Sequence, residues 1–226
     1  MYSYVEWFVK VGFEEGGVNG MGNHLLQIIR RYGLFGAVRL ARDIFLSRIF
    51  FRGVRVIRYP WYVRGGAHVR FGKSFTSGVG LRVDAFGSED VQVSFGNNIQ
   101  VGDYVHVAAI QSVVVGDDVL IASKVYISDH DHGLYAGAPV SQSRPSDIQV
   151  ERKLVSAPVV IGRNVWIGEN VCILKGVTIG CNSIIGASAV VTKSVPENSI
   201  VVGSPAKVIK VYDFERCSWV DVKGKS

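Results

Sequence analysis

Two histidines separated by a single residue are the side chains in this sequence best suited to proton transfer. His130 and His132 alternate with Asp129 and Asp131 in the stretch ISDHDHG. An imidazole has an unperturbed pKa of about 6.5, so it can take up and release a proton near neutral pH. A carboxylate beside it can orient the ring and stabilise its cation. The alternative is structural, because surface histidines are often only solvated and Asp side chains often close loops through Asx turns.

The two histidines open a polar segment that interrupts a regular repeat. Read in sixes from Ile161, the first place is aliphatic, the fifth is small or β-branched, and glycine recurs in the second, where a tight turn favours positive φ. Neither a helix, with a period of about 3.6, nor a strand, with a period of about 2, repeats in sixes. The period therefore predicts one side of a three-sided coil, a short strand followed by a corner. The first-place residues are Ile161, Ile167, Ile173, Ile179, Ile185 and Val191, and earlier hexads begin at Phe71, Phe95, Val101, Val115 and Ile121.

Stacked coils of this kind predict a solenoid from about Phe71 to Pro196 with a continuous aliphatic core. Residues 128–158 leave the pattern, and a long excursion from a regular coil is more typical of a functional loop than of an accident. Its polar side chains either hold a sugar or an acidic glycan or are solvated charges. These side chains are Tyr135, Arg144, Arg152 and Lys153.

The positive charge of the chain lies in residues 1–64. This segment has 10 Lys or Arg against 4 Asp or Glu, whereas the remainder has 15 of each, so the segment carries the whole net charge of +6. Its arginines alternate with large apolar residues, and a helix is predicted from Asn23 with a break at Gly33 and Gly36. The helix is either an amphipathic anchor at a membrane surface or a cap whose apolar stripe covers the first coil. The stripe comprises Leu25, Ile28, Tyr32, Phe35, Val38, Phe45 and Ile49.

Composition excludes several classes of protein. Charged residues interrupt the longest apolar segment, so no membrane-spanning helix is expected, and no signal peptide is evident. Cys172, Cys181 and Cys217 form no CxxC pair, which disfavours a disulfide scaffold or a structural zinc site and favours a reducing cytosol. The coil region is electrically neutral and the basic segment is rich in large apolar residues, which disfavours nucleic-acid binding.

One long stretch resembles a known enzyme family. The sequence GRNVWIGENVCILKGVTIGCNSIIGASAVVTKSVPENSIVVGSPAKVIK is similar to the C-terminal half of the galactoside, maltose and serine acetyltransferases. Together with the preceding LFGAVRLARDIF and RYPWYVRG segments, it most resembles the O-acetyltransferases that modify capsule, O-antigen and exopolysaccharide sugars. The resemblance covers nearly the whole chain. It implies a mainly β fold, a left-handed parallel β-helix with a helical N-terminal segment and a long loop extruded from the coil.

The resemblance also divides the chain into three parts. Residues 1–64 form a cap or anchor, residues 65–203 form the acyltransferase domain with the loop 128–158, and residues 204–226 form a C-terminal tail.

The implied activity is a cytoplasmic, acetyl-CoA-dependent O-acetyltransferase that acts on a sugar hydroxyl of a bacterial surface polysaccharide or its precursor. The loop motif is similar to the family's catalytic motif and assigns the general base to His132. His130 is the reserve, because a shift of two residues would exchange the two, and Asp131 would orient the base. A backbone N–H of Gly168 or Glu169 would stabilise the oxyanion.

Other residues match family positions around the donor. Trp166 would lie beside the pantetheine or adenine, while Ala187 and Ser188 would offer backbone groups to the pantetheine amides. No metal is expected. Thr192, Lys193, Lys207 and Lys210 match family positions around the CoA phosphates. Lys207 and Lys210 stand where the family often has arginine, and they offer point charges rather than bidentate contacts.

The resemblance implies a homotrimer with the donor between neighbouring coils and a sugar or polysaccharide acceptor. If the N-terminal segment is an anchor rather than a cap, it would place the enzyme at the inner face of the membrane. Three alternatives remain open. The first is an N-acetyltransferase of a nucleotide-linked amino sugar, with the same base and donor. The second is a carbonic anhydrase-like enzyme that holds zinc through residues such as His106, His130 and His132. The third is a scaffold without catalytic activity.

Overall fold

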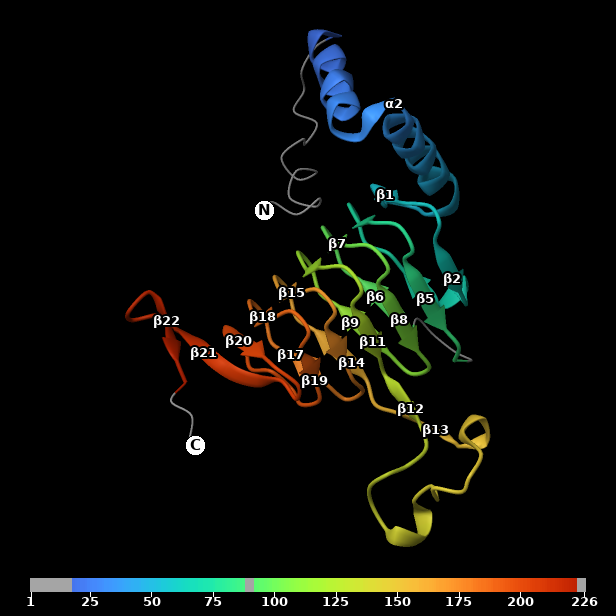
Figure 1. Cartoon of the computed structure of the whole chain (residues 1–226), viewed down its shortest axis with the longest axis vertical. Helices are drawn as coiled ribbons and strands as arrows, with labels where there is room; N and C mark the ends of the chain where they lie inside the picture. The colour runs from blue at the N-terminus through green and yellow to red at the C-terminus, as the bar shows by residue number, and fades with distance from the viewer. Residues whose placement is uncertain (1–17, 88–91, 223–226) are drawn as a thin grey trace.

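Three parallel sheets form the sides of a solenoid that runs through most of the chain (Figure 1). The computed structural model describes residues 18–87 and 92–222, with side chains from residue 26 onward. Sheet A contains β1 (Val56–Ile57), β4 (Thr76–Ser77), β7 (Gln100–Val101), β10 (Leu120–Ile121), β15 (Trp166–Ile167), β18 (Ile184–Ile185) and β20 (Ser199–Val202). Sheet B contains β2 (Tyr62–Arg64), β5 (Arg82–Ala85), β8 (His106–Ala109), β11 (Tyr126–Ser128), β16 (Cys172–Ile173) and β19 (Val190–Val191). Sheet C contains β3 (Val69–Arg70), β6 (Val93–Phe95), β9 (Val113–Val115), β14 (Val159–Ile161) and β17 (Thr178–Ile179), and a short 3-10 helix, η1 (Gly66–His68), precedes β3.

The first-place aliphatic residues of the hexads form the core, as the repeat predicts. In sheet A, Ile121, Ile167 and Ile185 are in register on successive coils, and all three are fully buried. Burial of each such side chain contributes roughly 1.5–3 kcal/mol relative to exposure. Near the first coils the core is aromatic, with the rings of Phe71 and Phe95 stacked at 5.4 Å between centroids.

The second-place glycines have a different purpose from the predicted one. Gly162 and Gly168 do not adopt positive φ, and a Cβ atom at either would lie within 2.8 Å of the backbone nitrogen of the next coil. The left-handed conformation falls instead on the fourth place of the hexad, at residues such as Asn164 (φ 54°) and Asn170 (φ 57°). Close coil stacking, rather than turn geometry, therefore excludes a side chain at the second place.

A kinked helix covers the first coil. Helix α2 (Val18–Phe50) begins before Asn23 and is interrupted at Gly33, one of the two predicted break points. The Ser47 hydroxyl accepts the Ile57 N–H at 2.8 Å and donates to the Asp43 carbonyl, which fixes the second half of the helix to β1.

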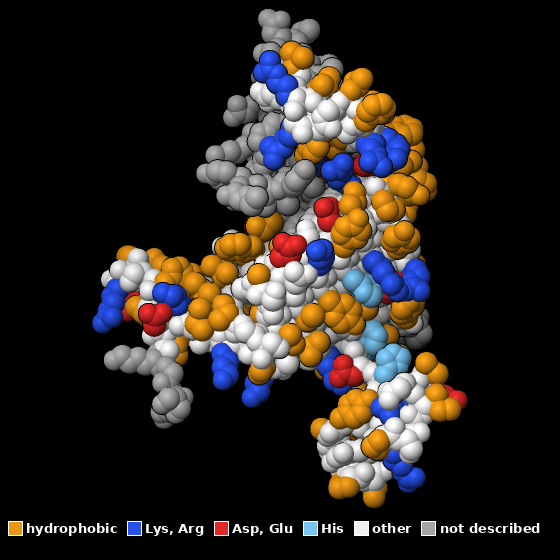
Figure 2. Space-filling model, viewed as in Figure 1, with side chains coloured by type: hydrophobic (Ala, Val, Ile, Leu, Met, Phe, Trp, Pro, Cys, Tyr) orange, Lys and Arg blue, Asp and Glu red, His pale blue; other side chains and the backbone are white. Residues whose placement is uncertain are grey.

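The helix presents a different face to the coil from the predicted one. Leu40, Asp43 and Ser47 are buried, whereas most of the predicted apolar stripe faces outward, with Phe35 87 % exposed. In Figure 2 this side of the helix carries a run of hydrophobic side chains with arginines beside them. Among the described residues no helix combines the length and the apolar character needed to cross a bilayer. The exposed members of the stripe include Phe35, Val38, Phe45 and Ile49.

Two segments depart from the coil. The predicted loop leaves sheet B as β12 (His130–His132), passes two short 3-10 helices, η2 (Pro139–Ser141) and η3 (Gln149–Glu151), and returns as β13 (Leu154–Ser156), antiparallel to β12. At the C-terminal end, β21 (Lys207–Asp213) and β22 (Ser218–Asp221) form an antiparallel hairpin that continues sheet A. Figure 1 shows the loop and the hairpin projecting on opposite sides of the solenoid.

The predicted fold class, a hexapeptide-repeat β-helix with a helical N-terminal segment and an extruded loop, is confirmed. The sheets of the solenoid continue beyond residues 65–203 at both ends. Strands β1 and β2 lie within residues 1–64 and pair with β4 and β5, and the hairpin lies within residues 204–226.

Candidate active site

A buried carboxylate organises the base of the extruded loop. Asp129 is fully buried and accepts backbone N–H groups from Ile110, Gln111 and Ser112 at 2.7–3.2 Å. Its Oδ1 also lies 2.8 Å from Nδ1 of His130. The side chain therefore closes the turn at 110–112, as an Asx-type interaction would, and orients an imidazole as well.

The two histidines differ in exposure. The His130 side chain is 13 % exposed, and with Nδ1–H donated to Asp129 its Nε2 carries the lone pair. His132 is exposed at the mouth of the loop, and its carbonyl accepts a hydrogen bond from the Tyr135 hydroxyl. Because alternate residues of a strand face the same side, the two imidazoles share one face of β12. The loop mouth thus offers one oriented, shielded imidazole and one open to a ligand.

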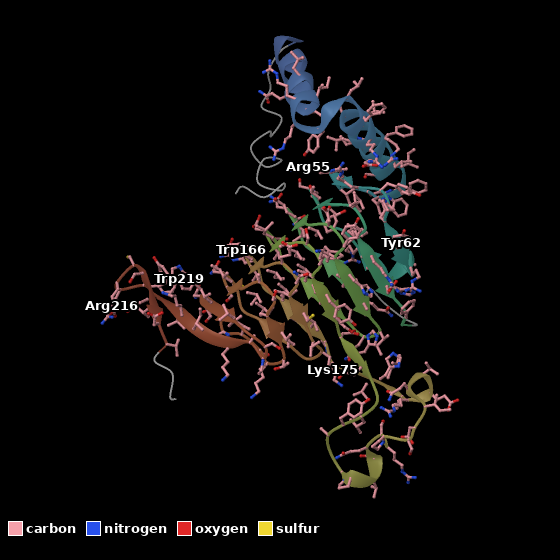
Figure 3. The ribbon with its side chains drawn as sticks, viewed as in Figure 1. Arg55, Tyr62, Trp166, Lys175, Arg216 and Trp219 are labelled. Carbon is pink, nitrogen blue, oxygen red and sulfur yellow. The ribbon has the colours of Figure 1, made fainter. Side chains whose placement is uncertain are left out.

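Asp131 does not orient either imidazole, contrary to the prediction. It lies on the other side of β12, where its Oδ2 is 2.9 Å from Nζ of Lys175. Lys175 also donates to the Val155 carbonyl at 3.4 Å. Figure 3 shows Lys175 at the base of the extruded loop. The pair fastens β12 and β13 to the coil, a role that the sequence did not indicate.

The loop is fixed by its own polar side chains. Arg152 donates to the Tyr135 hydroxyl at 2.8 Å and to the carbonyls of Arg144 and Asp147 at 2.8 and 3.0 Å. Tyr135 and Arg152 thus hydrogen-bond to each other and Arg152 to the loop backbone, an arrangement that neither the glycan-binding nor the solvated-charge alternative described.

The residues predicted for the donor lie at another corner of the coil. Trp166 is in β15 and half-exposed, and Gly168, Ala187 and Ser188 follow β15 and β18, where sheet A turns into sheet B. The Gly168 N–H donates to the Ile185 carbonyl at 2.8 Å, so it is engaged within the coil and not free for an oxyanion.

The predicted phosphate-binding residues are at the C-terminal end of the coil. Thr192, Lys193 and Lys207 are exposed, in keeping with contact to a ligand. Lys210 pairs with Asp221 on β22 at 3.2 Å, which competes with any phosphate for its charge. The structure thus brings these four residues to one end, with three of them open.

The predicted general bases and the residues predicted for the donor lie at different corners of the coil. His130 and His132 leave sheet B at its corner with sheet C, whereas Gly168 and Ala187 are at the corner of sheets A and B. A full sheet face separates the two corners, so a single chain does not bring the imidazoles to the predicted donor groups.

Two features escaped the sequence reading. A groove of about 450 Å³ lies between sheet A and the C-terminal hairpin, and Figure 3 shows Trp166 and Trp219 on this flank, opposite Tyr62. It is lined by Asn164, Trp166, Asn182, Ile184, Asn198, Tyr212, Phe214 and Trp219. The second feature is a charged cluster centred on Asp84 in sheet B, with Arg64 at 2.6 Å, Arg82 at 2.8 Å and His106 at 2.9 Å. Arg64 and His106 lie 20 and 22 residues from Asp84 in the sequence, so only the exact length of each coil would have brought them together with Asp84 and Arg82.

A metal centre was the predicted alternative for His106, His130 and His132. Within residues 18–87 and 92–222, no three His, Cys, Asp or Glu side chains come together as a metal ion would require. His106 is bound to Asp84 and His130 to Asp129, so the two rings have separate partners.

Comparison with known proteins identifies the family. The bacterial transferase hexapeptide family (six repeats) matches residues 158–193. "Putative lipopolysaccharide biosynthesis O-acetyl transferase WbbJ" of Escherichia coli K12 is 49 % identical over 197 residues, which cover 86 % of this chain and 98 % of that protein.

Two solved structures share the fold. A galactoside acetyltransferase in complex with coenzyme A has a TM-score of 0.54 at 23 % identity, covering 95 % of this chain and 94 % of that one. AntD, an N-acyltransferase from Bacillus cereus in complex with dTDP and 3-hydroxybutyryl-CoA, has a TM-score of 0.61 at 18 % identity, covering 76 % and 88 %. With a near full-length relative at 49 % identity and a coil of hexapeptide repeats, the chain belongs to the hexapeptide-repeat transferase family, and it is an acetyltransferase.

Proposed function

We propose that this enzyme transfers an acetyl group from acetyl-CoA to a sugar hydroxyl of a bacterial surface polysaccharide or its precursor. One observation carries the proposal: the chain is 49 % identical to a relative named for lipopolysaccharide O-acetyl transfer, and the match covers 98 % of that relative's length. The exposed imidazole at the mouth of a well-ordered loop supports it, because a hydroxyl becomes an effective nucleophile only as its proton is removed.

In the proposed reaction, His132 Nε2 or Nδ1 accepts the hydroxyl proton as the sugar oxygen attacks the thioester carbonyl carbon. The carbon–sulfur bond of the tetrahedral intermediate then breaks, and the imidazolium returns the proton to the departing CoA sulfur. His130, held by Asp129, is a positioning residue that keeps β12 in place. The oxyanion donor is assigned to the N–H of Glu169, since the Gly168 N–H is engaged with Ile185.

The complete site requires a second copy of the chain. Because the loop mouth and the donor corner lie at different corners of the coil, we assign the imidazole to one subunit and the Glu169 amide, Trp166 and the C-terminal lysines to its neighbour. A closed ring satisfies every site with one repeated interface, and we take the number of subunits, three, from the family resemblance. Size-exclusion chromatography with light scattering tests it, and a monomeric, fully active enzyme would contradict it.

The exposed face of α2 suggests where the enzyme works. Phe35 and Phe45 project from a helix rich in arginine, an arrangement suited to a bilayer surface with anionic headgroups. We assign the enzyme to the cytoplasmic side, where acetyl-CoA is made and free cysteines persist. Co-sedimentation with vesicles containing phosphatidylglycerol, but not with pure phosphatidylcholine, is expected. Phe35→Ala with Phe45→Ala should abolish it, whereas Phe214→Ala, an exposed aromatic on the C-terminal hairpin, should not.

Titration of the protein with acetyl-CoA by calorimetry tests the donor, and acetylation of glycan acceptors tests the reaction. Saturable binding near one donor per chain, followed by CoA release when a glycan is added, is the expected result. Absence of acetyl-CoA binding would refute the donor assignment.

The runner-up is acetylation of an amine on a nucleotide-linked sugar, because the coil is shared with an N-acyltransferase. Mild alkali distinguishes the two products, since an O-acetyl ester is cleaved under conditions in which an N-acetyl amide survives. An alkali-stable product would replace the hydroxyl acceptor with an amine and leave the base and the donor unchanged.

A further inference from the structure

The outward face of sheet B carries a charged cluster formed by Arg64, Arg82, Asp84 and His106, called here the Asp84 cluster. The Asp84 side chain is 2 % exposed, yet both arginines reach it: Arg64 through Nε at 2.6 Å and Nη2 at 2.8 Å, and Arg82 through Nε at 2.8 Å. His106 Nε2 completes the set at 2.9 Å. One buried carboxylate therefore holds two guanidinium groups and an imidazole side by side.

The cluster has an excess of positive charge. Burial alone would raise the pKa of Asp84, but hydrogen bonds from Arg64, His106 and Arg82 outweigh it and lower that pKa to about 2. Burial lowers the pKa of His106, and the charges of Arg82 and Arg64 add to this against the opposing effect of Asp84. At neutral pH the cluster thus combines two guanidinium cations with one carboxylate and a neutral imidazole.

The arginines retain donors for a ligand. Arg82 uses only Nε toward Asp84, and Arg64 uses Nε and Nη2, which leaves the other guanidinium N–H groups directed away from the carboxylate. Their side chains are 46 % and 51 % exposed. Because Asp84 already fixes the orientation of both guanidinium groups, an incoming anion would bind with little further loss of side-chain conformational entropy.

The cluster lies on the same face as the loop mouth. In the register of sheet B, Asp84 is opposite Ala108, which is opposite Ser128, the residue before Asp129. Two strand spacings, roughly 10 Å, separate Asp84 from Ser128 along the sheet. In Figure 2, Lys and Arg side chains gather on the flank of the solenoid below the helix, and histidines continue from them toward the base of the loop. An oligosaccharide spans such a distance with two or three sugar rings.

Aromatic rings border the cluster. The Arg64 guanidinium lies over the Phe86 ring at 4.8 Å, and the His106 ring is 5.3 Å from that of Tyr126. Tyr62, in register with Arg82, is also exposed. Flat aromatic faces beside guanidinium groups suit a sugar ring that carries an anionic substituent.

We propose that the Asp84 cluster is an acceptor subsite that binds the carboxylate or phosphate group of an anionic glycan while His132 acts on one of its hydroxyls. The identification of the ligand as the acceptor rests on the proposed function; binding of an anionic sugar by the cluster does not.

The test measures sugar binding without acetyl-CoA, so that failure of the donor assignment does not affect it. Ligand-observed NMR titrations of the full chain would use glucuronate, glucose 1-phosphate and glucose. We expect at least one charged sugar to bind about 10-fold more tightly than glucose, and the stronger of the two identifies the anionic group. Equal affinity for all three sugars, or no binding of any, would overturn the proposal.

Variants then locate the binding. Arg82→Gln leaves Arg64 and His106 on Asp84, and it should remove most of the preference for charged sugars. Arg70→Gln removes one exposed charge from sheet C on a neighbouring face, and it should leave the preference intact. An equal loss in both variants would indicate general electrostatic attraction and overturn the assignment. If Arg82→Gln fails to fold, Arg82→Lys decides: a several-fold weaker affinity for the charged sugar supports the subsite, and an unchanged one refutes it.

Discussion

The interior of the solenoid and the outward face of sheet B are built by different rules. Inside, Ile167 lies between Ile121 and Ile185, and similar aliphatic side chains repeat on the later coils. Outside, residues in equally strict register have unlike chemistry. The outward column of sheet B reads Tyr62, Arg82, His106, Tyr126, Cys172 and Val190. The regular stacking of the coils fixes the spacing between neighbouring strands. Unlike side chains on the outward face are therefore held at defined separations, close enough together to contact one ligand.

The largest expected effect falls on the loop mouth, outside the repeat. His132→Ala should lower kcat by at least about 100-fold, because the variant lacks the group that accepts the hydroxyl proton. Steady-state kinetics and acetyl-CoA titration should show that the affinity for the donor changes by less than about twofold, since donor contacts lie elsewhere. His130→Ala is the matched control and should retain more activity. Near-full activity in His132→Ala with loss in His130→Ala would move the base by two residues.

Within the interior, Ile167→Ala should lower the free energy of unfolding by about 3 kcal/mol, through lost burial and the cavity left between two coils. Urea denaturation measures this effect. Val160→Ala, on an outward position of β14, should change the same quantity by less than about 1 kcal/mol. Equal losses in the two variants would contradict the distinction between interior and surface.

The Asp84 cluster should make the surface contribute to stability in a pH-dependent way. The folded pKa of Asp84, about 2, lies below its ordinary value of 3.8, so the stabilisation by this carboxylate is present above pH 3.8 and is lost as the pH falls toward 2. The unfolding free energy of the wild type relative to Asp84→Asn should therefore decrease by about 2 kcal/mol between pH 7 and pH 2. If the difference in unfolding free energy between the wild type and Asp84→Asn does not vary with pH, the neighbouring arginines do not stabilise the charged form of Asp84.

The smallest effect concerns the contact between coils. Gly168→Ala places a Cβ atom 2.6 Å from the Ala187 nitrogen, so the backbone must shift, and thermal unfolding should reveal a loss of about 1–2 kcal/mol. Gly66→Ala is the control, because its Cβ would meet only a Val63 methyl group at 3.9 Å. If both variants are equally stable, coil stacking does not select glycine at the second place.

The coil could be predicted from the sequence because each hexad repeats the same pattern of buried and exposed positions. The period of six located the buried residues, such as Ile161 and Ile173, without knowledge of any contact. The excursion at 128–158 was evident for the same reason, as a gap in the period. Local repetition thus predicts both where the coil is and where it stops.

Side-chain partnerships were less predictable, because they depend on orientation and on distant segments. Asp129 and Asp131 have similar sequence surroundings, but Asp129 precedes β12 and is buried against the turn at 110–112 beside His130, whereas Asp131 lies in β12 and pairs with Lys175. Helix α2 has an apolar stripe at helical spacing, yet the side that carries Ser47 forms the hydrogen bonds to β1. Neither choice follows from local spacing alone.

The C-terminal hairpin has a consequence for assembly. A stack of parallel coils has no intrinsic length, because the last coil of one molecule offers open strand edges to the first coil of another. In sheet A, β21 pairs antiparallel with β20 and so occupies the edge that a further parallel coil would use. In sheet B, the Ala206 N–H donates to the carbonyl of Val190 on the last strand, β19. At the other end, α2 lies over β1. Both ends of the solenoid are thus covered by segments of the same chain, which opposes end-to-end association of molecules into fibres.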